Sequence, residues 1–126
     1  MRSRQSVSLL ILVAILVCSC ATPLPPADQL ARADYGAQPK QHEKMIREYF
    51  ARTLRDPYSI VYREITQPEK GVITNAFIDG GGYNYGWLVN ATINAKNVYG
   101  GYVGYKTYNF LFRGEDLVTV KTPDSP

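Results

Sequence analysis

The chain has 126 residues, of which 45% are hydrophobic, 20% charged and 12% aromatic, which excludes a disordered or fibrous protein and leaves room for one small globular domain. Its formal charge is +3 at pH 7 and falls to +1 without Arg2 and Arg4, which belong to the N-terminal segment. Such an even balance argues against a nucleic-acid partner, because neutralising phosphates requires clustered positive charge.

The N-terminus has the pattern of a bacterial secretory leader. Two arginines precede an apolar run over residues 7–17, which only Ser8 interrupts. About 11 residues are too few to cross a bilayer, which takes roughly 20. The next residues, Val17-Cys18-Ser19-Cys20, resemble the bacterial lipobox, in which an aliphatic residue and two small ones precede the acceptor cysteine. We therefore expect residues 1–19 to be a lipoprotein signal peptide and Cys20 to be lipidated.

Lipidation of Cys20 predicts a protein held on the membrane by its anchor. Cleavage before Cys20 removes Cys18, so the exported domain keeps no free thiol and no disulfide. The resemblance to bacterial lipoproteins implies three acyl chains, palmitate among them, and two or more chains anchor far more firmly than one. Ala21, in place of Asp, resembles lipoproteins sent to the periplasmic face of the outer membrane rather than kept at the inner membrane. An ordinary signal peptide or an uncleaved membrane anchor is the alternative.

Residues 20–39 are expected to form a tether between the anchor and the domain. Proline occurs here at positions 23, 25, 26 and 39. It favours extended backbone, so residues 28–33 have room for at most a turn or two of helix. Fully extended, the tether reaches roughly 65 Å at about 3.3 Å per residue, enough to hold the domain off the membrane. A disordered linker is the default, and docking of Tyr35-Gly36 onto the domain edge is the alternative.

One amphipathic helix is predicted, from Pro39 or Gln41 to Arg55. Its apolar residues recur at spacings of three and four, at Met45, Ile46, Tyr49, Phe50 and Leu54. Pro57 disfavours helical geometry at the residue before it and ends the helix. His42 is the only histidine of the chain and is expected to face solvent, because a metal site needs several convergent ligands.

From residue 58 onward the hydrophobic period changes to two, which predicts about five antiparallel strands. The expected strands are residues 59–65, 71–78, 87–95, 107–113 and 117–121, the first two forming a hairpin around a turn at residues 67–70. Residues 123–126 are expected to be a frayed tail. The predicted fold is a single α+β domain over residues 40–122, in which the N-terminal helix packs on the sheet face that carries Trp87.

Two stretches rich in glycine and tyrosine, residues 80–86 and 94–105, flank the best predicted strand. Neither has the spacing of a phosphate-binding loop, and neither leads into a helix. We expect loops at opposite ends of that strand, with glycines at tight reversals and tyrosines forming a recognition surface. The alternative is that the rings cap the sheet and the core edge. The candidate binding residues are Tyr83, Tyr85, Lys96, Asn97, Tyr99, Tyr102 and Tyr105.

Three segments resemble the motifs of a family of small bacterial envelope lipoproteins. They are Asp56-Pro57-Tyr58-Ser59, Tyr85-Gly86-Trp87, and the run Val89-Asn90 through Asn94-Ala95-Lys96-Asn97-Val98-Tyr99-Gly100-Gly101-Tyr102-Val103-Gly104. The similarity covers roughly residues 33–114. It implies the extent of the domain and its exported location, and it carries no activity.

Enzyme chemistry, a metal site and a cofactor are not expected. The sequence has no serine nucleophile motif with histidine and aspartate, no exported thiol and no cluster of cysteines and histidines. Carboxylates for an acid pair are Glu64, Asp79, Glu115 and Asp116, but Asp79 and Glu115-Asp116 fall in predicted turns, where acids commonly make local hydrogen bonds.

The expected function is therefore that of a non-enzymatic interaction lipoprotein, which presents its Gly/Tyr-rich surface to a protein partner in the cell envelope. The alternative is a glycan-binding module for peptidoglycan or lipopolysaccharide. In that case tyrosine faces would stack on sugar rings, while Asn94, Asn97 and Lys96 would hydrogen-bond to them. The first expectation leads, because the only tryptophan, Trp87, is expected in the core.

Overall fold

The computed structural model describes residues 24–75 and 82–123. The predicted signal peptide, Cys20 and residues 124–126 of the predicted tail lie outside the described residues. The elements are α1 (Ala27–Arg32), α2 (His42–Thr53), a short 3-10 helix η1 (Pro57–Ser59), β1 (Val61–Ile65), β2 (Glu69–Asn75), β3 (Gly82–Asn94), β4 (Lys106–Arg113) and β5 (Asp116–Lys121). Within the described ranges, every helix is too short or too polar to cross a membrane.

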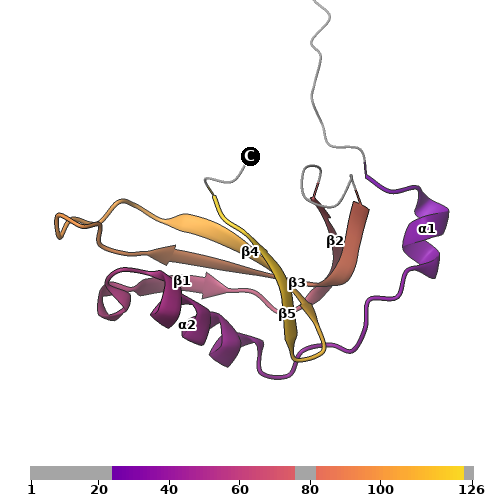
Figure 1. The fold of residues 1–126 in the computed structure, drawn as a ribbon, viewed down its shortest axis with the longest axis horizontal. Coiled ribbons are helices and arrows are strands. Elements are labelled where there is room, and N and C mark those ends of the chain that lie inside the picture. The colour runs from indigo at the N-terminus through magenta and orange to yellow at the C-terminus, as the bar shows by residue number, and fades with distance from the viewer. Residues whose placement is uncertain (1–23, 76–81, 124–126) are drawn as a thin grey trace, which may run out of the picture.

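The five strands form one antiparallel sheet, as the alternating pattern predicts (Figure 1). The order is β1-β3-β4-β5, and β2 also pairs with β3. β3 is 13 residues long, which lets it take two neighbours in succession along one edge. Its C-terminal part pairs with β1 and its N-terminal part with β2, while β4 occupies the other edge.

The predicted hairpin between residues 59–65 and 71–78 is wrong. β1 and β2 do not pair with each other; they follow one another along the same edge of β3. Between them, the Thr66 N–H donates to the Asn90 carbonyl and the Thr66 hydroxyl accepts from the Asn90 N–H, both at 2.9 Å. Pro68, which has no N–H, then interrupts the ladder. The proline therefore marks a break in one long edge rather than a reversal of the chain.

The core lies between α2 and the sheet, under the half of the sheet that β1 forms with the end of β3 (Figure 1). Its buried residues are Ile46 and Phe50 of α2, Val89, Ala91 and Ile93 of β3, and Phe110 and Phe112 of β4. The Phe50 ring packs edge-on against Tyr108 and Phe110, with centroid distances of 5.0 and 5.6 Å. Trp87 is half-buried against this cluster.

His42 does not face solvent as expected. It is the first residue of α2 and is only 9% exposed. Neither ring nitrogen has a hydrogen-bond partner in the part of the chain that the structure describes. The helical spacing alone could not show this, because the chain before α2 and the turn at Glu115 fold over the start of the helix. There Glu115 accepts hydrogen bonds from the backbone N–H groups of Lys40 and Gln41, at 2.7 and 3.3 Å.

Replacing His42 by Leu is expected to raise the free energy of unfolding. A buried polar group without a partner costs roughly 1–3 kcal/mol, and an apolar side chain of similar volume removes that cost. We expect a gain of about 1 kcal/mol in urea denaturation. The surface substitution Lys44→Leu on the same helix should change the value by less than about 0.5 kcal/mol. A loss of stability for His42→Leu would mean that the imidazole has a partner in solution.

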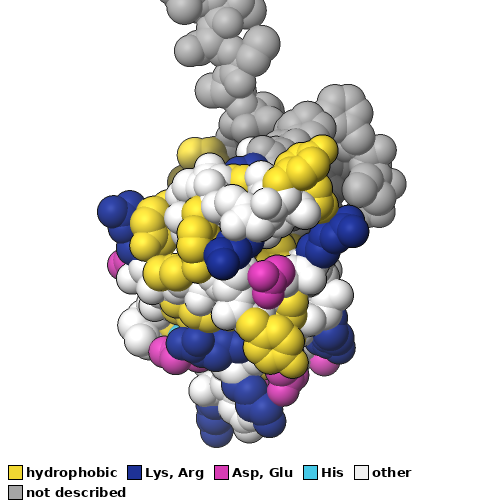
Figure 2. All heavy atoms as spheres, turned by 90° about the vertical axis from the view of Figure 1, so that its left-hand side faces the viewer, with side chains coloured by type: hydrophobic (Ala, Val, Ile, Leu, Met, Phe, Trp, Pro, Cys, Tyr) yellow, Lys and Arg dark blue, Asp and Glu magenta, His cyan; other side chains and the backbone are white. Residues whose placement is uncertain are grey.

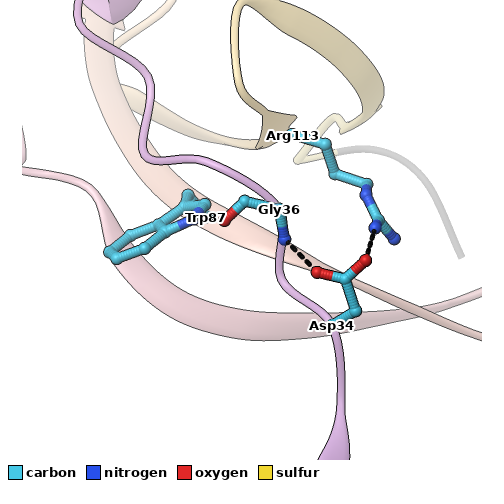
Figure 3. Close-up of polar contacts among 4 residues, drawn as sticks. All are labelled: Asp34, Gly36, Trp87 and Arg113. Atoms are coloured by element: carbon cyan, nitrogen blue, oxygen red, sulfur yellow. Dashed lines mark hydrogen bonds and ion pairs between the residues drawn. The ribbon is translucent and has the colours of Figure 1, made fainter.

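The segment before α2 is docked onto the sheet (Figure 3). The Asp34 carboxylate accepts from the Gly36 N–H at 2.9 Å and pairs with Arg113 Nη2 at 2.8 Å. The Trp87 indole N–H donates to the Gly36 carbonyl at 3.0 Å. The Tyr35 ring meets Tyr85 edge-on at 5.8 Å, which is the docking that the sequence left as an alternative. In the expected tether, residues 34–37 therefore follow the domain surface.

Release of this segment is expected at low pH. The hydrogen bond from Gly36 and the charge of Arg113 hold the pKa of Asp34 below its ordinary value of 3.8. A lowered folded-state pKa gives stability that is present above 3.8 and is lost as the pH falls through the lower, folded-state value. Trp87 is the only tryptophan, and its fluorescence should shift to longer wavelength over that window while the far-UV spectrum of the sheet is retained.

The matched control is Asp34→Asn, which removes the ion pair with Arg113 and leaves an oxygen that can accept from Gly36. Its tryptophan emission should not change over the same pH window. Equal pH dependence in the parent and in Asp34→Asn would show that another group releases the segment.

Candidate binding surface

The seven candidate residues do not form one surface. Residues 82–86 are not a loop but the start of β3, where Tyr83 lies opposite Thr74 and Tyr85 opposite Val72. The alternation Tyr83-Asn84-Tyr85 continues the strand pattern, and β2 supplies its partner. Tyr83 and Tyr85 therefore lie at one end of β3. The other five candidates lie beyond the opposite end, in the loop of residues 95–105, as expected for the two stretches (Figure 1).

Asn97 organises the 95–105 loop from within. Its side-chain oxygen accepts from the backbone N–H groups of Tyr99 and Gly101, at 2.9 and 3.1 Å. Its backbone N–H donates to the Gly101 carbonyl at 2.8 Å, and the Asn97 carbonyl accepts from the Gly100 N–H at 3.1 Å. Gly100 has φ +79°, a left-handed conformation that a side chain would disfavour. The role of Asn97 is therefore to hold the loop, which residue type alone did not reveal.

Two further contacts tie the loop to the 3-10 helix η1. The Ser59 hydroxyl accepts from the Lys96 backbone N–H, and the Ser59 carbonyl accepts from the Tyr102 hydroxyl, both at 3.0 Å. Lys96 and Tyr102 face each other in an isolated antiparallel bridge. At the loop's far side, the Asn94 side-chain oxygen accepts from the Gly104 N–H at 3.1 Å. The loop therefore has defined contacts at its base, in its middle and with a second element.

A hydrophobic surface results at this end of the molecule. We call it the loop surface; its members are Tyr58, Val98, Tyr99, Tyr102, Val103 and Tyr105, all at least 45% exposed. Tyr58 and Tyr99 are 99% and 92% exposed. Figure 2 looks onto this end and shows hydrophobic side chains in several groups, with Lys and Arg between them. Tyr58 was not a sequence candidate; its place beside Ser59, which contacts the loop, brings it to this end.

Two cations lie over tyrosine rings of the loop surface. The Arg63 guanidinium is 4.5 Å from the centroid of Tyr105, and the Lys96 ammonium is 5.5 Å from that of Tyr102. Each contact holds a long side chain against an aromatic face and keeps its charge at the surface. The segment 94–106 itself contains no acidic residue, although Figure 2 shows Asp or Glu side chains elsewhere on this face. The surface therefore combines rigid aromatic area with positive charge.

Of the four carboxylates considered for an acid pair, Glu115 has a structural role and Asp79 is not described. Both oxygens of Glu115 accept from backbone N–H groups before α2, and Asp79 lies outside the described residues. Among residues 24–75 and 82–123, no three His, Cys, Asp or Glu side chains gather closely enough to share a metal ion.

Comparison of the chain with protein-family models, with curated proteins and with solved structures finds no match in any of the three.

Proposed function

We propose that the protein is a lipid-anchored bacterial envelope lipoprotein that binds a protein partner through its loop surface. In this proposal residues 1–19 are removed, Cys20 carries the acyl chains on the periplasmic face of the outer membrane, and residues 40–122 form a single α+β domain. The protein has no catalytic role. Its partner is another protein of the envelope.

The observation that carries the proposal is the exposure of aromatic side chains on an ordered loop. Tyr99 is 92% exposed while its backbone N–H is held by Asn97 at 2.9 Å. Exposure of a tyrosine to solvent does not by itself require an ordered backbone, so the hydrogen bonds of the loop suggest that the position of the ring matters. Rigid, exposed tyrosines provide contact area at low entropic cost, which is why they are enriched where proteins bind one another.

A protein partner is favoured over a glycan by how the polar groups are used. The side-chain oxygens of Asn94 and Asn97 accept hydrogen bonds from the loop backbone, at 2.9–3.1 Å. The Trp87 indole N–H donates to Gly36. The side-chain oxygens of Asn94 and Asn97 and the Trp87 indole N–H, which could otherwise bind sugar hydroxyls, are thus engaged within the domain.

The test compares the full lipoprotein with the double variant Tyr58→Ala/Tyr99→Ala, recovered from envelopes after reversible crosslinking. Both rings are almost fully exposed, so the free energy of unfolding of the variant should stay within about 0.5 kcal/mol of the parent, as for ordinary surface changes. We expect a discrete partner band to fall at least about tenfold, the equivalent of 1.4 kcal/mol in affinity. Val118→Ala, an exposed hydrophobic on β5, is the control and should leave the band unchanged.

Two results count against the proposal. An unchanged set of crosslinked proteins in the double variant would exclude the loop surface as the interface. Sedimentation of the parent with purified cell-wall sacculi, lost in the double variant, would favour the glycan-binding alternative. The anchor is checked independently by the intact mass, which should equal residues 20–126 with a diacylglyceryl group and an N-acyl chain on Cys20.

A further inference from the structure

The sheet face opposite α2 carries a row of polar side chains that crosses three strands. Asn90 of β3 pairs with Asn109 of β4, and Asn109 pairs with Lys121 of β5. Within the described residues, the side-chain amides of Asn90 and Asn109 make no hydrogen bond, and the Lys121 ammonium makes no hydrogen bond or ion pair. The three side chains therefore lie side by side on one face of the sheet and bring hydrogen-bond donors and one positive charge together.

An apolar area adjoins this row. Leu88 and Leu111, on the same face, lie over Gly71 and Gly86, whose missing side chains leave room for them. Leu88 and Ile73 border a groove of about 350 Å³, whose other walls include Leu24 and the polar row, whereas Leu111 is fully buried beneath this face. The groove therefore has an apolar end and a cationic, amide-lined end, which matches an amphiphile with a negatively charged head.

Leu24 places this face close to the membrane. It lines the groove and is four residues after Cys20, the anchor of the proposed function, on which this inference rests. Four residues span at most about 14 Å, at up to 3.6 Å each. The rest of the expected tether does not lengthen this distance, because Leu24 already lines the groove and residues 34–37 are docked on the domain. α2 lies on the opposite face (Figure 1).

We propose that the sheet face opposite α2 lies on the bilayer and that its polar row binds the phosphate of an anionic phospholipid headgroup. Lys121 supplies the charge, and the amides of Asn90 and Asn109 donate hydrogen bonds to phosphate oxygens. Leu24, which is 77% exposed, and the half-buried Leu88 contact the upper part of the acyl chains. The domain thus has one fixed orientation, in which α2 faces away from the membrane and the loop surface projects sideways from the anchor.

The experiment uses the full lipidated protein in vesicles that contain phosphatidylglycerol and a lipid with a spin label on its headgroup. A fluorophore is placed on Thr119→Cys, which lies opposite Leu111 on the sheet face away from α2, or on Glu48→Cys, on the exposed side of α2. The mature chain holds no other free thiol once Cys20 is acylated. We expect at least about threefold stronger quenching at position 119 than at position 48. Equal quenching at both positions overturns the proposed orientation.

The headgroup site is tested by Lys121→Glu, with Lys44→Glu on α2 as the matched charge reversal. Lys121→Glu should remove most of the extra quenching at position 119, and Lys44→Glu should leave it unchanged. Replacing phosphatidylglycerol by phosphatidylcholine should reduce it as well. If the quenching at position 119 is the same in Lys121→Glu and in vesicles of phosphatidylcholine, the proposed headgroup site is wrong. The intact mass separates the two proposals, because a chain without acyl groups on Cys20 overturns both, whereas a lipidated chain with equal quenching overturns this one alone.

Discussion

Replacing Phe50 by Ala is expected to lower the free energy of unfolding by about 3–5 kcal/mol. The side chain is fully buried between α2 and the sheet and makes ring contacts with Tyr49, Tyr62, Tyr108 and Phe110. The space left is not easily filled by a shift of α2, because the rings of Tyr62, Tyr108 and Phe110 are large and are fixed on β1 and β4. The whole stability of such a domain is of order 5–15 kcal/mol, so the variant should be close to unfolded at physiological temperature.

The measurement is urea denaturation followed by far-UV circular dichroism and by Trp87 fluorescence. Tyr49→Ala, one residue earlier and only partly buried, is the matched aromatic control and should cost clearly less. A midpoint for Phe50→Ala close to that of the parent would show that α2 does not cover the sheet as described.

A single added methyl group at Gly86 is expected to have a comparable effect. A Cβ atom there would lie 2.5 Å from the Phe112 carbonyl oxygen and 3.1 Å from the Leu111 side chain. The first contact is with backbone, which moves only if the pairing of β3 with β4 shifts. Overpacking of this kind costs typically 1–3 kcal/mol, and the backbone position of the clash favours the upper end. Gly86→Ala should therefore lower the urea midpoint strongly, although alanine is the smallest change possible.

Gly101→Ala is the control for this prediction. It lies in the loop, has no left-handed φ, and its nearest atom to an added Cβ is the Asn97 side-chain oxygen at 3.8 Å. Its stability should stay within about 0.5 kcal/mol of the parent. If Gly86→Ala also fell within that range, β3 and β4 would have to be farther apart at this point than described.

The strands could be predicted from the sequence, but their neighbours could not. Alternation of apolar and polar residues reports which face a side chain occupies, and it is silent on which strand lies beside it. Residues 59–78 were therefore expected as a hairpin, while β1 and β2 share one edge of β3. Pro68 was the available signal, since a residue without an N–H interrupts a ladder as readily as it enters a turn.

The candidate binding residues were predicted from the local richness in glycine and tyrosine. Such composition does not distinguish residues that hold the loop or a strand in place from residues that are exposed for binding. Tyr83 and Tyr85 read as loop because glycines flank them, yet they continue β3 opposite β2. Asn97 was predicted as a candidate binding residue, and the structure shows that its side-chain oxygen holds the loop by accepting from two backbone N–H groups. Tyr58 joins the loop surface through its neighbour Ser59, a contact between segments 43 residues apart that no local pattern contains.

The central claim, that the loop surface is a protein interface, is tested most directly by photo-crosslinking in intact cells. A photoreactive residue at position 99 replaces an almost fully exposed ring, and position 48 on the exposed side of α2 is the control. The account predicts one discrete protein adduct from position 99 and none from position 48. The same adduct from both positions, or no adduct from position 99 while the lipidated protein is present at normal abundance, would contradict it.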